Sequence, residues 1–319
     1  MAYSSINKPS LHFNTVLYTG DATSNRGITG VGFQPDLVWN KSKSSNNHYI
    51  FDAIRSAGQR ISTNTTSAED DKSAEFISFD SDGFTLTNNA GSLNINGSGV
   101  TFANWCWKAD NTSGSSNTDG SITSTVAANT TAGFSIVTFT GTGSNATVGH
   151  GLGAAPKCMW LKGRSGATQW NIYNASSGAN KHLNFDSTEV EQSYTNRFND
   201  TDPTSTVFTV GTDAETNPSS GTMVAYCFAE VKGFSKFGGY TANNSSDGPF
   251  LYCGFRPAMV IIKNRSRAGE SWSLYDNKRD GYNPNNNRLY PNATTAEGAE
   301  TKIDFLSSSE RSAEALSIS

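Results

Sequence analysis

The chain has 319 residues, a formal net charge of −4 and 16% charged residues, against about 25% in an average domain. Its 24 basic residues form no cluster, which excludes a surface that follows nucleic-acid phosphates, and its 11% aromatic content excludes a disordered chain. No segment reaches the roughly 18 apolar residues of a membrane helix, and Met1–Ser5 has no feature of a Sec-type signal. We therefore expect no membrane partner, and synthesis and assembly in a cytoplasm.

The chain begins with short strands separated by polar loops. Residues 11–18 alternate apolar and polar side chains as a strand does, and a proline-led strand is expected at about 36–41. The same pattern occurs twice more in the chain, as described below, and those two segments are apolar on both faces. This indicates an interior strand that is covered on both sides. Further elements are a hairpin turn at 80–83, one helical turn within 53–74, and strands at 48–52, 75–79, 84–86 and 102–108.

The proline-led strand occurs three times, at Pro35, Pro156 and Pro257, and each copy has a lysine six positions past the proline. An aromatic-threonine turn precedes each copy at a constant spacing: 35 − 18 = 17, 156 − 139 = 17 and 257 − 240 = 17. Constant spacing of this kind predicts a tandem array of one module. We expect the prolines to begin equivalent strands, with buried residues at one matching position: Leu37, Cys158 and Met259.

The predicted fold class is all-β, as tandem antiparallel β-sandwich modules with the jelly roll as the nearest named form. Module one is assigned to residues 1–109, module two to 133–232 and module three to 233–319. The Ser/Thr/Asn/Gly-rich stretch 110–132 is assigned as a linker. Because this linker separates only modules one and two, we expect that pair to be hinged and modules two and three to be stacked.

Four motifs carry a resemblance to a known family: residues 32–39, 51–55, 79–86 and 103–109. The chain resembles repeat-bearing structural proteins of bacteriophages, especially marine ones. The match covers nearly all of module one and mainly the proline-led strand of the others. The resemblance implies a virion protein of tail-fibre or surface-appendage type. Its implied partners are further copies of itself, other virion proteins and a host surface glycan or receptor. It supplies no binding residues.

The acidic residues have two interpretations, as a catalytic pair or as residues favoured by a turn. A glycan depolymerase needs two carboxylates about 5–10 Å apart in a groove, and the nearest candidates are Asp80 with Asp82 and the run 69–71. Asp80 and Asp82 flank a glycine turn, where Asp is favoured for its turn chemistry alone. The same turn lacks the other ligands of a calcium-binding loop. We predict no catalytic residue, no metal site and no cofactor.

Histidines and cysteines show no spacing that points to a site. The histidines share no module position, and we expect them on the surface or at strand edges: His12, His48, His150 and His182. The cysteines fall where sister modules have apolar residues, which predicts core thiols: Cys106, Cys158, Cys227 and Cys253.

Aromatic residues provide the candidate ligand-binding positions. Trp170, Tyr173, Trp272 and Tyr275 lie on the second strand of modules two and three, beside loops that vary between modules. They fit either stacking on sugar rings or packing in a core. The lysine column, Lys41, Lys162 and Lys263, is the one charged position recognised in all three copies. We expect these ammonium groups to extend to water.

These features favour a non-enzymatic virion structural protein that attaches through weak contacts repeated over modules and subunits. A carbohydrate-binding module or glycan depolymerase and a capsid decoration protein are the alternatives. Module three ends before its closing strand, since the counterpart of residue 224 would be 224 + 101 = 325, and residues 315–318 alternate as a strand. We expect its open sheet edge to be covered by a neighbouring subunit or another virion protein, so that the assembled chain is oligomeric.

Overall fold

The computed structural model describes residues 4–87, 93–245, 248–281, 283 and 285–306. These residues form an all-β protein of antiparallel sheets, and their one helical element is the 3-10 turn η1 (Pro9–Leu11). The helical turn expected within 53–74 is wrong, because short strands occupy that segment. The strand expected at 315–318 lies outside the described residues.

Module one is a sandwich of two sheets. The larger sheet has six strands in the order β1 (Phe13–Thr19), β9 (Thr101–Trp107), β3 (Leu37–Ser42), β4 (His48–Asp52), β5 (Gln59–Ser62) and β6 (Asp70–Asp71). The smaller sheet is β2 (Arg26–Ile28), β8 (Gly83–Leu86) and β7 (Phe76–Asp80). The chain crosses between the sheets at β1–β2–β3, at β6–β7 and at β8–β9. The predicted hairpin joins β7 to β8.

Module two repeats this plan. Its six-stranded sheet has the order β10 (Ser115–Asn117), β11 (Ser124–Asn129), β12 (Phe134–Thr140), β19 (Thr222–Phe228), β14 (Cys158–Gly163) and β15 (Asn171–Asn174). Two smaller pairs are β13 (Ala146–Gly149) with β18 (Val207–Val210) and β16 (Lys181–His182) with β17 (Gln192–Ser193). The stretch 110–132 is not a free linker, because it supplies β10 and β11 to this sheet.

Module three is smaller in the described part of the chain. It has two hairpin-like pairs, β20 (Met259–Ile262) with β21 (Ser273–Asp276) and β22 (Asn285–Arg288) with β23 (Gly298–Ile303). Its described residues between β19 and β20 form no strand.

The repeat prediction is confirmed at the proline-led strands. β3, β14 and β20 each begin two residues past their proline, and each pairs with the following strand in the same register: Leu37 opposite Asp52, Cys158 opposite Asn174 and Met259 opposite Asp276. The expected burial holds for Leu37 and Cys158, whereas Met259 is only half-buried.

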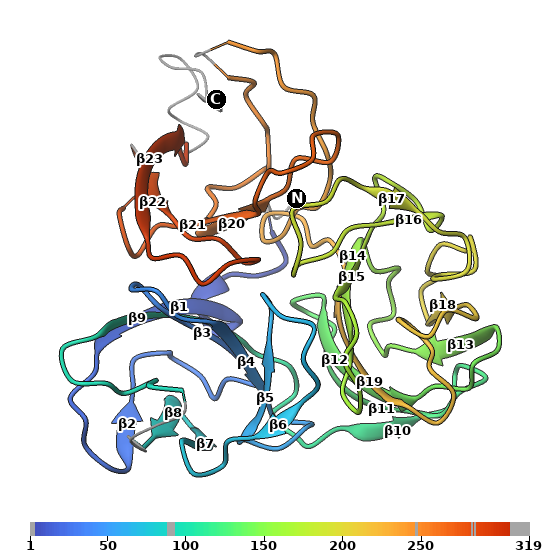
Figure 1. The fold of residues 1–319 in the computed structure, drawn as a ribbon, viewed down its shortest axis with the longest axis horizontal. Coiled ribbons are helices and arrows are strands. Elements are labelled where there is room, and N and C mark those ends of the chain that lie inside the picture. Colours follow the sequence, from blue (N-terminus) through green and yellow to red (C-terminus); the bar gives the residue numbers. More distant parts are fainter. Residues whose placement is uncertain (1–3, 88–92, 246–247, 282, 284, 307–319) are drawn as a thin grey trace.

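The three modules form three lobes around a common centre (Figure 1). Alternate residues of each large sheet enter two different cores. On β3, Val38 packs inside the module-one sandwich, while Leu37 and Trp39 enter a central core that also contains Trp160 of module two and Leu274 of module three. The Trp39 and Trp160 ring centroids are 5.7 Å apart. This sharing explains the apolar runs on both strand faces, and it corrects the expected hinge and stack: all three modules pack on one core.

Candidate functional site

The four aromatic residues proposed for ligand stacking are buried, with exposed fractions of 0% for Trp170, 2% for Tyr173, 5% for Trp272 and 1% for Tyr275. The Trp170 indole donates a 2.8 Å hydrogen bond to the Ser62 carbonyl of module one. Because none of the four rings presents a face to solvent, the sugar-stacking interpretation is replaced by the core interpretation.

The tryptophans instead join neighbouring modules. Trp272 of module three donates a 2.8 Å bond to the Asn184 carbonyl of module two, as Trp170 does to module one. The strand register places His48 at the equivalent position of module one. The neighbouring Thr63, whose amide donates to the His48 carbonyl, makes the contact instead: its hydroxyl donates a 2.7 Å hydrogen bond to the Pro291 carbonyl of module three. His48 Nε2 completes no hydrogen bond among the described residues. Each module therefore reaches the preceding one, and the three contacts close a ring.

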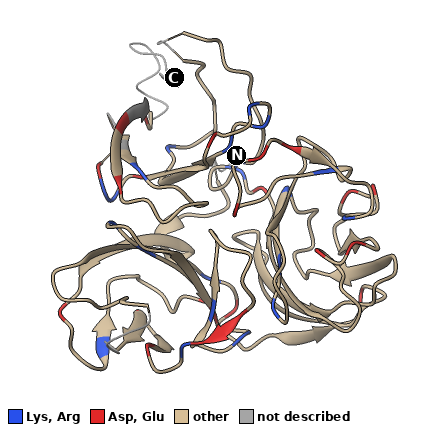
Figure 2. Cartoon of the chain, viewed as in Figure 1, with Lys and Arg blue, Asp and Glu red and all other residues tan. Residues whose placement is uncertain are grey.

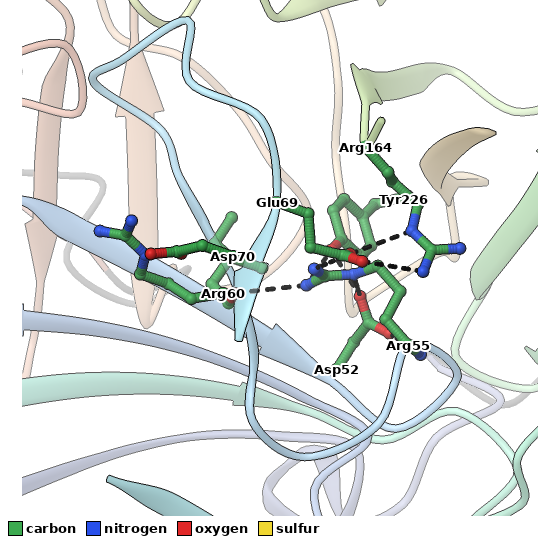
Figure 3. A network of polar contacts seen from close by, with 8 residues as sticks. Asp52, Arg55, Arg60, Glu69, Asp70, Arg164 and Tyr226 are labelled. Atoms are coloured by element: carbon green, nitrogen blue, oxygen red, sulfur yellow. Dashed lines mark hydrogen bonds and ion pairs between the residues drawn. The ribbon is translucent and has the colours of Figure 1, made fainter. Parts of the chain in front are cut away.

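A buried ionic cluster lies where module one meets module two (Figure 3). Arg55 contacts Asp52 Oδ2 at 2.5 Å and Glu69 Oε2 at 2.8 Å, and the side chains of Arg55 and Asp52 are fully buried. From module two, the Tyr226 hydroxyl donates to Asp52 Oδ2 at 2.6 Å, and Arg164 holds Glu69 through bonds of 2.9 and 3.0 Å. We call this set the one–two interface.

The same cluster recurs where module three meets module one, the three–one interface. Arg279 contacts Asp276 Oδ2 at 2.6 Å and Glu297 Oε2 at 2.8 Å. The Trp105 indole of module one donates to Asp276 Oδ2 at 3.1 Å, and Lys43 of module one lies 2.9 Å from Glu297. Trp105 and Tyr226 occupy the same register position on β9 and β19.

The two–three interface has a reduced version. Asn174 and Ser177 stand where the other modules have the Asp–Arg pair. Glu191 contacts Arg265 of module three at 3.3 Å and accepts a hydrogen bond from the Ser177 hydroxyl. The Arg265 side chain is 37% exposed, against 23% for Arg164. This interface therefore lacks a buried charge pair of the kind that the other two contain.

Main-chain bonds complete each interface in the same way. The amides of Glu69, Glu191 and Glu297 donate to the carbonyls of the basic residues that their side chains hold, at 2.9, 2.9 and 2.8 Å. Each glutamate thus fixes a neighbouring module through both its backbone and its carboxylate. No local pattern marks these columns in the sequence. The basic residues nevertheless keep the repeat offsets (43 + 121 = 164 and 164 + 101 = 265), so an alignment of all charged residues by those offsets reveals them.

Burial and charge pairing oppose each other in the one–two interface. Burial disfavours the charged form of Arg55, but Asp52, Tyr226 and Glu69 outweigh it, so that its pKa is raised. Burial likewise disfavours ionised Glu69, yet hydrogen bonding to Arg164 and the charge of Arg55 hold its pKa below the ordinary value. Burial raises the pKa of the Tyr226 hydroxyl, which remains a hydrogen-bond donor. The cluster is charged and fully paired, as a stable buried ion network requires.

The lysine column does not reach water as expected. Lys41 and Lys162 are 0% exposed, and the Lys162 ammonium donates to the carbonyls of Thr66 in module one and Thr168, at 2.9 and 2.6 Å. Burial lowers the pKa of both lysines to about 8. Lys263 is half-buried, with its ammonium 2.9 Å from the Glu270 carbonyl. Backbone carbonyls replace water because the neighbouring module covers the strand end.

The acidic candidates for catalysis serve local structure. Asp80 accepts hydrogen bonds from the hydroxyls of Ser78 and Thr85, both at 2.7 Å, and Asp82 accepts from the amides of Gly30 and Gly32 at 3.1 and 2.6 Å. Of the run 69–71, Glu69 belongs to the one–two interface, and Asp70 pairs with Arg60 at 2.5 Å. No cluster of three metal-binding side chains occurs within the described residues. The charges are scattered singly over the lobes, and β6 stands out as acidic (Figure 2).

The expected surface position of the histidines is wrong for three of them. His48, His150 and His182 are buried, at 0%, 0% and 1% exposed, and only His12 is partly open. Burial lowers the pKa of His182 to about 4. The cysteine prediction is confirmed for three residues, since Cys106, Cys158 and Cys227 are free and buried; Cys253 is half-buried.

Comparison with known proteins gives one match. Residues 8–313 match the family described as Domain of unknown function (DUF7483). No curated protein and no solved structure matches the chain. In the described part of the chain, no helix is both long and apolar enough to span a membrane.

Proposed function

The chain belongs to the DUF7483 family, and we propose that it is a non-enzymatic structural protein of a bacteriophage particle, built into a tail fibre or another surface appendage. It acts there by attachment, through weak contacts repeated over the copies in the particle. The motifs at 32–39 and 103–109 support this assignment through their resemblance to repeat-bearing phage proteins.

The observation that carries the proposal is the closed ring of three modules on one core. Trp39, Trp160 and Leu274 share that core, and ionic contacts bind each module to the next. Three lobes are thereby held in constant relative positions. A rigid multi-lobed unit suits attachment, because contacts made on a preorganised surface lose little conformational entropy and multiply through effective concentration.

The use of the polar residues also supports a structural role. Charged side chains that sequence alone placed as candidates, such as Glu69, Asp80 and Asp82, are engaged by neighbouring donors. A catalytic pair must instead face a groove that admits substrate. We therefore expect no hydrolysis of host polysaccharide by the purified protein, and little loss of attachment after Asp80→Asn or Asp82→Asn.

Imaging of intact particles tests the location. An antibody fragment raised against the purified chain is expected to decorate tail fibres or another surface appendage in electron micrographs. Labelling confined to the capsid shell would support a decoration protein instead, and absence from purified particles would refute the virion assignment.

A parallel assay tests the enzymatic alternative. The protein is incubated with host surface polysaccharide, and released reducing ends are measured beside a buffer control. Release that disappears in either Asp80→Asn or Asp82→Asn would contradict the non-enzymatic role. Binding to host cells without release is the expected result.

A further inference from the structure

Module three lacks, among the described residues, the strand that closes the sheet of each sister module. β9 lies between β1 and β3, and β19 lies between β12 and β14, whereas β20 pairs with β21 alone. All four residues of β20 are half-buried, while β3 and β14 are buried throughout. The apolar side chains of this edge are therefore more accessible than those of its counterparts, and Met259 and Ile261 also pack against the shared core.

The amide that follows each proline shows the same difference. The Asp36 amide donates to the Trp107 carbonyl of β9 at 2.9 Å, and the Lys157 amide to the Phe228 carbonyl of β19 at 2.7 Å. The equivalent Ala258 amide makes no bond within the described part of the chain, and Ala258 is exposed. The Ala258 carbonyl still accepts from Asn277 at 3.0 Å. The edge is thus formed on the β21 side and open on the other.

We propose that the open edge of β20 binds, in antiparallel register, an extended apolar strand of a partner protein, in the place that β9 and β19 take in their own modules. Main-chain hydrogen bonds to an exposed sheet edge supply affinity in this mode of recognition, and the alternating side-chain sites supply specificity. The site does not depend on where the protein lies in a particle.

The two closing strands define the chemistry of the bound strand. Opposite Leu37 and Cys158, the equivalents of Met259, they place large aromatic side chains, Trp107 and Phe228. Opposite the equivalents of Val260 both have cysteine. The bound strand is therefore apolar on both faces, with a large side chain toward the shared core and a small one toward the module.

One position of the site differs from the sister modules. The residue of the bound strand opposite Ile261 is the equivalent of Trp105 in β9 and of Tyr226 in β19. Trp105 donates a hydrogen bond to the buried Asp276, and Tyr226 donates one to the buried Asp52. The residue that would accept from the bound strand of module three is Asn174 of module two, which has a neutral amide at the position of Asp52 and Asp276. Its Oδ1 already accepts from the amide and hydroxyl of Ser176, at 2.9 and 2.7 Å. Because no buried carboxylate needs a donor there, the bound strand carries a plain apolar residue such as Phe or Leu at this position.

Two further features precede β20 in the chain. Residues Phe250, Leu251 and Tyr252, upstream of β20, are 46%, 37% and 57% exposed, an unusual run for large apolar side chains. The segment 235–241, which corresponds to β1 and β12 by the repeat offset, forms no strand. In the other two modules, β1 and β12 pair with the closing strands β9 and β19. The free edge of the bound strand would therefore allow residues 235–241 to pair with it in the same way.

A peptide probe tests the site. The labelled peptide carries the sequence of Thr222–Phe228 with Phe in place of Tyr226, lysines at both ends for solubility, and reducing conditions throughout. We expect saturable binding by fluorescence anisotropy, none by a scrambled peptide, and new protection from hydrogen exchange at 259–262 and 235–241.

Variants at residue 258 locate the contact. Ala258→Pro removes the open amide while keeping the carbonyl bonded to β21, and is expected to weaken peptide binding about two- to tenfold, the effect of one hydrogen bond. Ala258→Ser keeps the amide and serves as the matched control, with unchanged affinity. Thermal unfolding of both variants checks that module three remains folded.

Three outcomes would overturn the proposal. Slow exchange at 259–262 in the free monomer would show that the chain itself covers the edge. A concentration-dependent dimer with protection at 259–262 would make a second copy the occupant. Failure of the peptide to bind, or binding that is indifferent to Ala258→Pro and gives no protection at 259–262, would show that this edge is not a strand-binding site.

Discussion

The Tyr226 hydroxyl of module two donates a 2.6 Å hydrogen bond to the buried Asp52 carboxylate of module one. The same carboxylate pairs with Arg55 of its own module, so one acid connects a local ion pair to a neighbouring module. The arrangement recurs between module three and module one through Trp105 and Asp276. The stability of the ring therefore depends on a few buried polar residues as well as on the shared apolar core.

Loss of Arg55 should be strongly destabilising. Arg55→Met leaves Asp52 buried without its cation, and breaking a buried pair in this way costs about 3–5 kcal/mol. Chemical denaturation followed by tryptophan fluorescence measures the change. Arg267→Met is the control, since Arg267 is 77% exposed in its pair with Glu270 and such pairs contribute about 0–1 kcal/mol. Equal effects of the two variants would contradict the proposed importance of the buried network.

The ring should open first at the two–three interface. The amide of Glu191, bonded to Arg265, and that of Gly269, bonded to Thr188, are expected to exchange faster than their counterparts at Glu69 and Thr168. Faster exchange is expected because Asn174 and Ser177 occupy the positions that hold a buried Asp–Arg pair in the other two modules. Native-state hydrogen exchange with mass spectrometry measures these rates.

A double variant tests the cause of that difference. Asn174→Asp combined with Ser177→Arg recreates the pair of the sister modules and should slow exchange at Glu191. Asn174→Asp alone introduces a partly buried charge without its cation and should accelerate it. If both variants exchange like the parent, the charge pair does not determine which interface opens.

The two buried lysines should make a contribution to stability that increases with pH in the alkaline range. Burial lowers the pKa of Lys41 and Lys162 from 10.5 to about 8, so above pH 8 the unfolded chain binds more protons than the folded one, and the free energy of unfolding increases with pH. Below about pH 8 both states are protonated and the contribution is constant. Thiol ionisation in the unfolded chain opposes this rise from about pH 9, because burial raises the pKa of Cys106 and Cys227 above 9.0. Tyrosine ionisation opposes it above pH 10, because burial raises the pKa of Tyr226.

The difference between the parent and a lysine variant, measured between about pH 8 and pH 10, isolates this contribution, because the buried thiols and tyrosines are common to both proteins. Lys162→Met should reduce the slope of unfolding free energy against pH, whatever its effect on absolute stability. Lys157→Met, at an exposed position just before the same strand, should leave the slope unchanged. An unaltered slope in Lys162→Met would show that the buried ammonium does not lose its proton in this range.

Trp170→Phe should weaken the one–two interface without affecting attachment. The variant keeps most of the buried ring but leaves the Ser62 carbonyl without the indole donor, at a cost of about 1–3 kcal/mol. Thermal unfolding and host-cell binding are measured together. Loss of cell binding by a folded, otherwise stable Trp170→Phe protein would restore the ligand-binding interpretation of this residue.

Local patterns sufficed to predict the proline-led strand and the strand that follows it in each module. β4 was predicted with its observed bounds, and the strands after Pro35, Pro156 and Pro257 were placed by their constant spacing from an aromatic residue. These features depend on alternation, β-branched and aromatic residues and turn chemistry within a few residues, and such signals are present in the chain before it folds.

Only the tertiary structure decided what covers the second face of each central strand. The sequence marked β3 and β14 as buried on both sides, but other modules supply that cover, and contact between modules leaves no local signal. The same reason explains the misplaced Lys162, whereas His150 and His182 are buried by contacts within module two. Lys162 is buried because Thr66, 96 residues away in module one, offers its carbonyl, and Glu69 meets Arg164 across 95 residues. The repeats determined three like modules; the closure of those modules into a ring determined which of their polar residues became structural.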